Sequence, residues 1–174
     1  MSSPLWAPWR MEYILGPKDH GSCVFCGIEA APDEERRSRL VVHTGERAFV
    51  MMNRYPFAPG HLLVMPYRHV DSLEKLEPEE HDELFRLVRD ASVRLRKAVR
   101  AEGLNLGCNL AAVARAGVAA HLHVHIVPRW GGDTNFMPVI ADTRVVSQAL
   151  HETRDHLTEF FADLGPRPER GGGA

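Results

Sequence analysis

Three histidines at alternating positions are the side chains of this sequence best suited to chemistry. His121, His123 and His125 lie in the run HLHVHIVPR, where an aliphatic residue separates each pair. Side chains of a β-strand alternate between its two faces, so this spacing predicts three imidazoles on one face and the aliphatic side chains on the other. The aliphatic face is expected to join the core, and the imidazole face is expected to line a surface or a cleft.

Three interpretations of this histidine face are open. It is a polar strand face that happens to use histidine, although Thr, Lys or Ser would serve that purpose better. It is a zinc site, because two histidines at i and i+2 on a strand commonly bind that metal. Or it is a nucleophilic site, in which one imidazole attacks a phosphorus atom and its neighbours orient it. An imidazole suits that role because an appreciable fraction of it is uncharged near neutral pH.

The cysteines indicate a second centre. Cys23 and Cys26 form a C-x-x-C pair, and Cys108 stands apart. Three cysteines do not make a disulfide framework, so in a reducing compartment the pair indicates metal or redox chemistry. A redox role is less favoured because the βαβ context of a thioredoxin is missing. A closed tetrahedral zinc site needs two more ligands, and Cys108 is expected to be a small core residue.

The elements that position these residues predict an α+β fold. Apolar runs and turn residues predict five strands, at 40–43, 47–52, 61–66, 103–110 and 121–129. Helical spacing of apolar residues predicts a long helix over 77–102, with Pro78 near its start and Gly103 just past its end. A second helix is predicted over 145–164, and a charged loop or short helix over 30–39. Strand clusters with two helices favour α+β over a βαβ series.

The composition excludes several classes of protein. The chain has 174 residues, which is one domain by length. It carries 21 Lys and Arg against 23 Asp and Glu, for a net charge of −2, which does not favour general nucleic-acid binding. No apolar run approaches the ~20 residues of a membrane span, and the N-terminal segment lacks the apolar stretch of a secretory signal. We therefore expect a cytoplasmic protein that binds neither membrane nor nucleic acid.

Two motifs together resemble the histidine triad (HIT) family. The run HLHVHIVP resembles that family's His-φ-His-φ-His-φ-φ signature, where φ is apolar. Upstream, NRYPFAPGHLLVMPYRHV resembles its Asn…Pro…Pro-Gly-His segment, which leads into a hydrophobic strand. The flanks LWAPWRMEYI and PRWGGDTNF resemble the branch that contains bacterial diadenosine tetraphosphate phosphorylases and related hydrolases. This resemblance implies an antiparallel sheet of about five strands with a long packed helix, and a homodimer.

The resemblance also implies an activity, the cleavage of a nucleotide phosphoanhydride such as diadenosine tetraphosphate. His123 would attack the α-phosphorus and form a covalent nucleotidyl-histidine, which water or inorganic phosphate then resolves. His125 would contact the phosphate oxygens and help the leaving group, and His61 would orient the triad. Asn53 would contact the ribose hydroxyls. Without these roles, His61 would be a buried structural histidine and Asn53 a turn residue.

The loop before the triad departs from the family pattern. The family normally carries a Gln, Ser or Thr there that contacts the phosphates, whereas this chain has Gly117 and Val118. Backbone N–H groups of a loop that contains Gly117 can still cradle an anion. Asn109, at the end of the preceding strand, and Arg115, inside the loop, are the candidates to compensate. Arg115 is otherwise a solvated surface residue.

For the cysteine pair, the resemblance implies a structural zinc ion that the chemistry itself does not require. Zinc-bearing relatives take the remaining ligands from positions that correspond to His69 and His121. Two alternative functions stay open: a metal-dependent hydrolase with the three triad histidines as zinc ligands, and a non-catalytic nucleotide-binding module. The chain then divides into an N-terminal arm (1–20), a HIT domain (21–140), a C-terminal helical extension (141–164) and a disordered tail (165–174).

Overall fold

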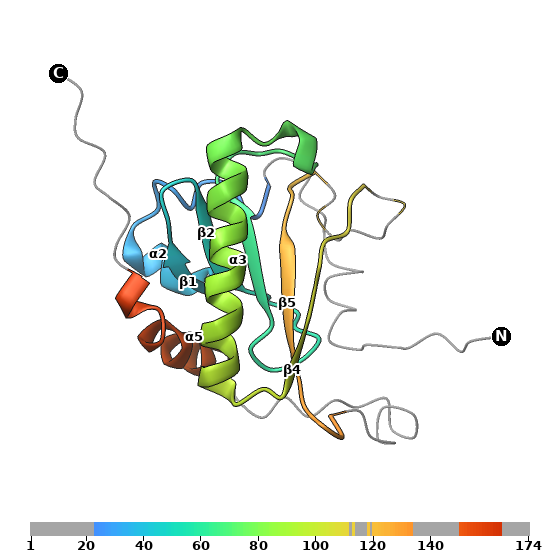
Figure 1. Cartoon of the computed structure of the whole chain (residues 1–174). Coiled ribbons are helices and arrows are strands. Elements are labelled where there is room, and N and C mark those ends of the chain that lie inside the picture. The colour runs from blue at the N-terminus through green and yellow to red at the C-terminus, as the bar shows by residue number, and fades with distance from the viewer. Residues whose placement is uncertain (1–22, 112, 114–117, 119, 134–149, 165–174) are drawn as a thin grey trace.

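Five strands form one antiparallel sheet in the computed structural model of this chain, which describes residues 23–111, 113, 118, 120–133 and 150–164 (Figure 1). The order across the sheet is β1-β2-β3-β5-β4. The strands are β1 (Val41–Thr44), β2 (Ala48–Met52), β3 (Leu62–Pro66), β4 (Gly103–Gly107) and β5 (Val124–Arg129). The predicted α+β class and five-stranded sheet are therefore confirmed. The predicted arm and tail lie outside the described residues.

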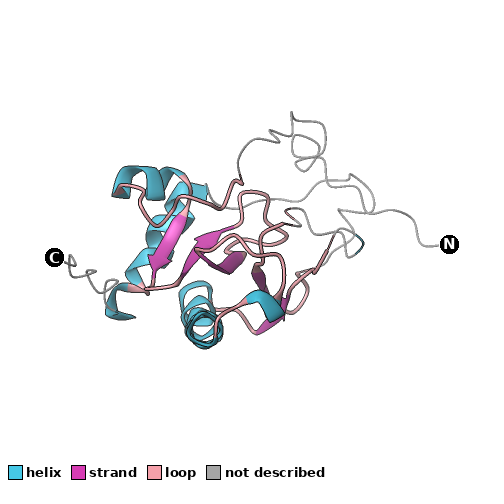
Figure 2. Ribbon diagram, turned by 90° about the horizontal axis from the view of Figure 1, so that it is seen from above, coloured by secondary structure: helices cyan, strands magenta, loops and turns pink. Residues whose placement is uncertain are grey.

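One long helix, α3 (Pro78–Val99), lies across one face of this sheet (Figures 1 and 2). It begins with a capping box between Glu77 and Glu80, and it ends at Arg100, whose φ of 49° is left-handed. The helix therefore stops short of the predicted residue 102. Among the described residues, the other helical segments are α2 (Asp33–Ser38), α5 (Leu150–Glu159) and the short 3₁₀ turns η2 (Leu73–Lys75) and η4 (Ala162–Leu164).

The centre of the sheet is buried on both faces because alternate residues of strands β2 and β3 enter two different apolar clusters. The α3 cluster, on the helix side, contains Val50 of β2, Val64 of β3 and the inner face of α3. The opposite cluster contains Phe25, Ile28, Val41, Phe49, Met51, Leu63 and Met65. Burying both faces fixes the strand register, since a slip by one residue would exchange the two sets of side chains.

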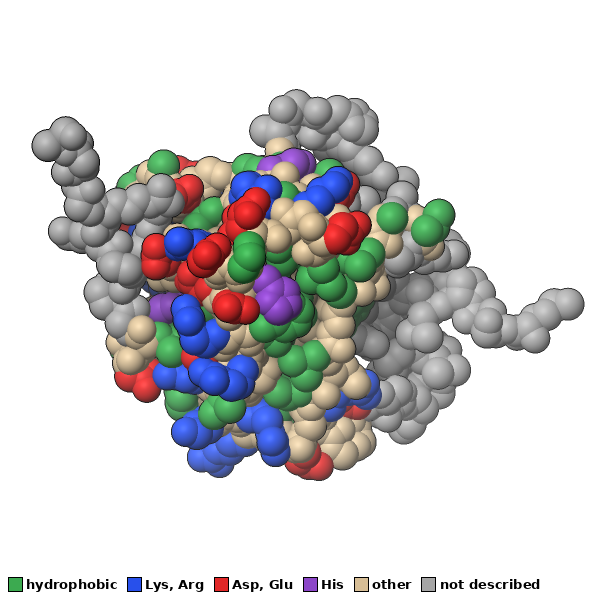
Figure 3. Space-filling view, turned by 45° about the horizontal axis from the view of Figure 1, so that its top comes forward, with side chains coloured by type: hydrophobic (Ala, Val, Ile, Leu, Met, Phe, Trp, Pro, Cys, Tyr) green, Lys and Arg blue, Asp and Glu red, His purple; other side chains and the backbone are tan. Residues whose placement is uncertain are grey.

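Charge is distributed unevenly along α3. Its first turn carries Glu79 and Glu80, and its last turn carries Arg96 and Lys97. In the space-filling view, acidic side chains gather toward the upper part of this face and Lys and Arg toward the lower part (Figure 3). This arrangement complements the helix dipole, which favours anions at the N-terminus and cations at the C-terminus.

In the described residues, no helix combines the length and the apolar character that crossing a membrane requires.

The histidine segment differs from the predicted strand in one respect. Strand β5 begins at Val124, so only His125 of the three histidines lies within it. The neighbouring strand β3 ends at Pro66, and the backbone N–H of Leu122 instead donates to the carbonyl of Val70, 2.6 Å away. The predicted alternation still holds, because Leu122, Val124 and Ile126 enter the α3 cluster.

Candidate active site

The ring of His123 is held by one hydrogen bond that fixes which nitrogen carries its proton. Its Nδ1 lies 2.7 Å from the carbonyl oxygen of His121. A carbonyl only accepts, so Nδ1 carries the hydrogen and Nε2 keeps its lone pair. No described residue forms a hydrogen bond with that Nε2. Burial, which leaves His123 5% exposed, lowers the pKa of its ring below the ordinary value and keeps it neutral at pH 7.

A second chain of hydrogen bonds has an equally definite direction. The backbone N–H of Phe57 donates to Nδ1 of His61 over 3.1 Å, so His61 carries its proton on Nε2. That Nε2 lies 2.9 Å from Nδ1 of His125 and donates to it. A neutral His125 therefore carries its own proton on Nε2. The rings of His123 and His125 are neighbours, with centroids 4.9 Å apart.

The Pro-Gly-His segment is folded so that His61 enters this chain. Gly60 has a φ of +82°, and a Cβ added there would lie 3.3 Å from side-chain atoms of Leu95 and Val99 on α3. Asn53 closes the loop: its backbone N–H donates to the carbonyl of His61, and its side chain accepts from the N–H of Tyr55. Only glycine can adopt the left-handed φ of Gly60 and pass this close to α3 without strain.

The four predicted metal ligands lie together. Ligand atoms of Cys23, Cys26, His69 and His121 are all within 4.8 Å of one another. The Nδ1 atom of His121 lies 3.4 Å from Cys23 Sγ and 3.7 Å from Cys26 Sγ, and Nδ1 of His69 lies 3.3 Å from Cys26 Sγ. Tetrahedral zinc with ordinary bond lengths would separate sulfur and nitrogen ligands by about 3.6 Å. The set therefore has the ligand types and spacing to hold such an ion.

The loop that carries the cysteines is held in a ligand-ready shape. The backbone N–H of Phe25 points to Cys23 Sγ at 3.5 Å, and the N–H of Cys26 donates to the carbonyl of Cys23 at 3.1 Å. The guanidinium of Arg39 donates to the carbonyls of Val24 and Cys26. In the metal-free protein, burial and the neighbouring Cys23 raise the pKa of Cys26 to about 11. A bound cation would lower it again, because a metal binds the thiolate.

His121 belongs to both centres. Its Nε2 donates to the carbonyl of Pro66, 2.9 Å away, so the Nδ1 that faces the cysteines keeps the lone pair that a metal needs. Its own carbonyl holds His123. Burial lowers the pKa of His121 below its ordinary value, so it too is neutral at pH 7.

The predicted phosphate contacts are only partly described. Gly117 and Arg115 lie outside the described residues. Val118 packs against the opposite cluster. Asn109 is exposed two residues beyond Gly107, which pairs with His125 across the β4–β5 ladder, so it lies toward the triad end of the sheet.

Two aromatic residues of the site carry no motif signal in the sequence. The ring of Phe57 stacks on His61 with centroids 5.0 Å apart, and the ring of Phe25 lies 5.3 Å from that of His123. Their only signal was position, since one precedes His61 by four residues and the other lies inside the C-x-x-C pair.

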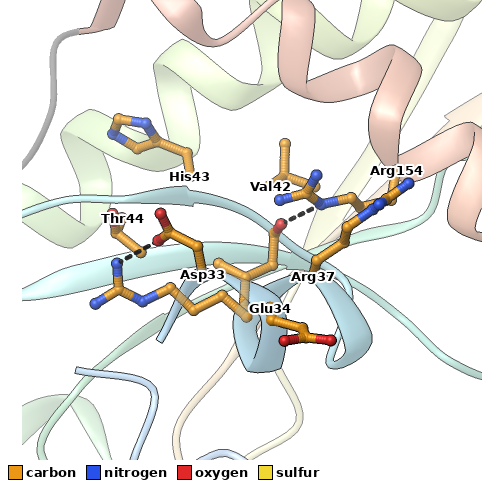
Figure 4. A pocket seen from close by; sticks show the side chains of 9 residues that line it. Asp33, Glu34, Arg37, Val42, His43, Thr44 and Arg154 are labelled. Carbon is orange, nitrogen blue, oxygen red and sulfur yellow. Dashed lines mark hydrogen bonds and ion pairs between the residues drawn. The ribbon is translucent and has the colours of Figure 1, made fainter. Parts of the chain in front are cut away.

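A groove between α2, β1 and α5 lies apart from these histidines (Figure 4). It is lined by Asp33, Glu34, Arg36, Arg37, Val41, Val42, His43, Thr44 and Arg154. Its arginines are engaged: Arg154 donates to the carbonyl of Val41, Arg36 to the carbonyls of Ile28 and Glu29, and Arg37 to Asp155. We assign no function to this groove.

Comparison with known proteins agrees with the geometry. The model of the HIT domain matches residues 34–132, more than half of the chain. The chain belongs to the HIT family. A relative of this HIT protein in Mycobacterium tuberculosis is described as an AP-4-A phosphorylase. The two are 40% identical over 166 residues, which cover 91% of this chain and 84% of the relative.

Two further proteins are similar to this chain. The asymmetrical bis(5'-nucleosyl)-tetraphosphatase of Schizosaccharomyces pombe is 40% identical over 114 residues, which cover 66% of this chain and 58% of that protein. The solved structure of a zinc-bound histidine triad family protein from Mycobacterium smegmatis has a TM-score of 0.64 and 27% identity, covering 82% of this chain and 95% of that one.

Proposed function

We propose that this HIT protein cleaves dinucleoside polyphosphates such as diadenosine tetraphosphate through a covalent intermediate on His123. The observation that carries the proposal is the hydrogen bond from His123 Nδ1 to the carbonyl of His121, which leaves Nε2 with a free lone pair on a buried, neutral ring. A neutral imidazole held in one orientation is a ready phosphorus nucleophile. The relatives named as a phosphorylase and a tetraphosphatase support this substrate class.

In the first step, the lone pair of His123 Nε2 attacks the α-phosphorus. The new phosphorus–nitrogen bond forms as the bond between that phosphorus and the bridging oxygen breaks, and the nucleoside triphosphate leaves with the electron pair. The ring becomes an N-phosphorylated imidazolium, whose Nδ1–H remains on the carbonyl of His121. That carbonyl stabilises the positive charge as it develops.

His125 acts as a hydrogen-bond donor to phosphate oxygens. Because His61 donates to its Nδ1, the proton of a neutral His125 resides on Nε2. A polyphosphate leaving group is stable as an anion, so it needs a donor on its oxygens rather than a full proton transfer. We propose that His61 keeps His125 in this tautomer, and that Asn53, Asn109, Arg115 and the backbone at Gly117 contribute to substrate binding.

In the second step, an acceptor oxygen displaces His123 from the phosphorus. Inorganic phosphate would give a nucleoside diphosphate, and water would give a nucleoside monophosphate. The experiment is to incubate the protein with diadenosine tetraphosphate, with and without phosphate, and to identify the products. ADP with ATP indicates phosphorolysis, and AMP with ATP indicates hydrolysis. If neither pair forms, the proposed function is wrong.

We further propose that Cys23, Cys26, His69 and His121 hold a structural zinc ion. The spacing of their sulfur and nitrogen atoms supports this set, as does the zinc-bound relative from Mycobacterium smegmatis. A bound ion would cross-link the cysteine loop to the segment that carries His123. No step of the proposed chemistry passes through it.

The alternative of a hydrolase with all three triad histidines on one metal has less support. Nδ1 of His121 faces the cysteines. By contrast, Nδ1 of His123 is hydrogen-bonded to the carbonyl of His121, and Nδ1 of His125 is hydrogen-bonded to His61. A non-catalytic nucleotide-binding module would bind nucleotide without forming an intermediate on His123.

We also propose, from the family resemblance, a homodimer in the reducing cytoplasm and the domain division into 1–20, 21–140, 141–164 and 165–174.

A further inference from the structure

Phe25 touches both the metal cluster and the nucleophile. Its backbone N–H lies 3.5 Å from Cys23 Sγ. Its side chain is 8% exposed, and its ring centroid lies 5.3 Å from that of His123 and 5.7 Å from that of His121. Phe25, one of the two residues between the cysteines, therefore packs against the His123 ring.

The second contact on His123 also comes from the cluster. Nδ1 of His123 donates to the carbonyl of His121, whose own ring faces both cysteines. This hydrogen bond and the bond to Cβ hold the imidazole at two points, which leaves only small movements of the ring. The edge-on and tilted contacts with Phe25, at interplanar angles of 88° to His121 and 59° to His123, restrict those movements.

We propose that Phe25 is a positioning residue that couples the metal cluster to the nucleophile. Ligation of Cys23 and Cys26 would tie their hydrogen-bonded loop to His69 and His121. The tied loop would hold the Phe25 ring in place, and that ring would hold His123 in the orientation for attack. Metal loading thereby sets the rate of nucleotidyl transfer although the ion takes no part in the bond changes. This inference rests on the proposed function and on the proposed metal set.

A small displacement of the His123 ring is enough to lower the reaction rate strongly. Misplacing a reacting group by about 1 Å costs about 100-fold in rate, and removing a residue that orients a metal ligand typically costs about 10- to 100-fold. Phe25 is also part of the opposite apolar cluster, so its loss affects stability as well. The test must therefore separate orientation of His123 from general loosening of the fold.

The test compares four proteins, each loaded with zinc and each stripped by a chelator: wild type, Phe25→Ala, Phe25→Leu and Val24→Ala. Val24 lies in the same loop but is 63% exposed, so it is the matched control. Single-turnover rate constants and KM are measured with diadenosine tetraphosphate. Zinc content is measured directly, and the ring ¹H–¹⁵N spectrum at one fixed pH reports the environment of His123 independently of activity.

We expect the zinc-loaded Phe25→Ala protein to retain zinc, to lose about 10- to 100-fold in the single-turnover rate with little change in KM, and to show shifted His123 ring signals. Removing zinc from the wild type should lower the single-turnover rate by a similar factor. Removing zinc from Phe25→Ala should lower that rate by less than about a further twofold, because two changes that act through the same coupled element do not have multiplicative effects. Val24→Ala should keep the wild-type ratio of loaded to stripped rates.

The coupling is overturned if stripping lowers the rate of Phe25→Ala by the same factor as that of wild type. It is also overturned if Phe25→Ala changes KM alone, which would make Phe25 a substrate contact. If Phe25→Ala does not fold at the assay temperature, Phe25→Leu, which keeps the apolar volume but not the flat ring, carries the same comparison. If wild type cleaves nothing, the proposed function fails, and the ring spectra of loaded and stripped protein still test the coupling.

Discussion

Removing the N–H that His61 donates to His125 tests the chain of hydrogen bonds that runs from Phe57 through His61 to His125. His61 is fully buried, accepts from the N–H of Phe57 on Nδ1 and donates from Nε2 to His125 over 2.9 Å. His61→Leu fills similar space but can neither accept nor donate. His61→Gln offers an amide oxygen and an amide N–H at comparable reach, so it can replace both bonds.

The size of the effect follows from removing the donor to Nδ1 of His125 in this part-buried hydrogen bond. An unsatisfied buried group costs about 1–3 kcal/mol, and each 1.4 kcal/mol corresponds to about tenfold in rate. If that energy is lost from the state in which His125 donates to the substrate, His61→Leu should lower kcat by about 5- to 150-fold. His61→Gln should stay within about threefold of wild type, because both hydrogen bonds are retained.

Both variants are compared with wild type in steady-state assays with diadenosine tetraphosphate, after thermal unfolding has established that each is folded at the assay temperature. The reasoning would be refuted if His61→Leu matched wild type, because the donor would then be irrelevant. Equal losses in the Leu and Gln variants would refute it too, since the effect would then come from packing rather than from the direction of the hydrogen bonds.

Three further predictions concern a glycine beside His61, a histidine outside the site and the metal set. Gly60→Ala should lower the free energy of unfolding by about 1–3 kcal/mol in urea titrations, because its φ of +82° is left-handed and its Cβ would crowd α3. Gly107→Ala, where a Cβ would meet nothing within 4 Å, should cost far less, and equal losses would contradict the steric argument. Burial and Arg94 lower the pKa of His43 in the folded protein, so as the pH falls through about 6.5 the unfolded chain binds this proton more readily than the folded protein, and stability falls with the pH. The stability of wild type relative to His43→Phe should therefore increase as the pH rises from about 5 to 7 in urea titrations, and a constant difference would count against it. Elemental analysis should find one zinc ion per chain in wild type and in Cys108→Ser, whose substitution lies outside the cluster, and none in Cys26→Ser. Zinc retained by Cys26→Ser would remove that residue from the ligand set.

Much of the fold could be predicted from the sequence because its signals are local. The apolar stripe of α3 and its terminal signals placed the helix to within a few residues. The short apolar runs predicted five strands, and the family resemblance implied that they form one antiparallel sheet. The exact start of β5 could not be predicted, because it depends on where its neighbour stops. Pro66 ends β3, and Leu122 pairs with Val70 instead. This is a tertiary event that no pattern inside the histidine segment reports.

The candidate site divides in the same way. The metal set could be predicted because cysteines and histidines at matching motif positions are rare together, and the structure brings all four into one cluster. The direction of each hydrogen bond could not be predicted, since it depends on which carbonyl or N–H faces each ring. Phe25 was missed for the same reason: an aromatic residue near a C-x-x-C pair is ordinary until its ring is seen against His123.

The central claim is that Nε2 of His123 forms a covalent bond to the α-phosphorus. Its most direct test is intact-protein mass spectrometry after a brief incubation with diadenosine tetraphosphate and a neutral denaturing quench, followed by mapping of the modified peptide. We predict a mass increase of one adenylyl group on His123 in wild type and none in His123→Ala. Rapid turnover by wild type without any adenylylated protein, or full turnover by His123→Ala, would contradict the account.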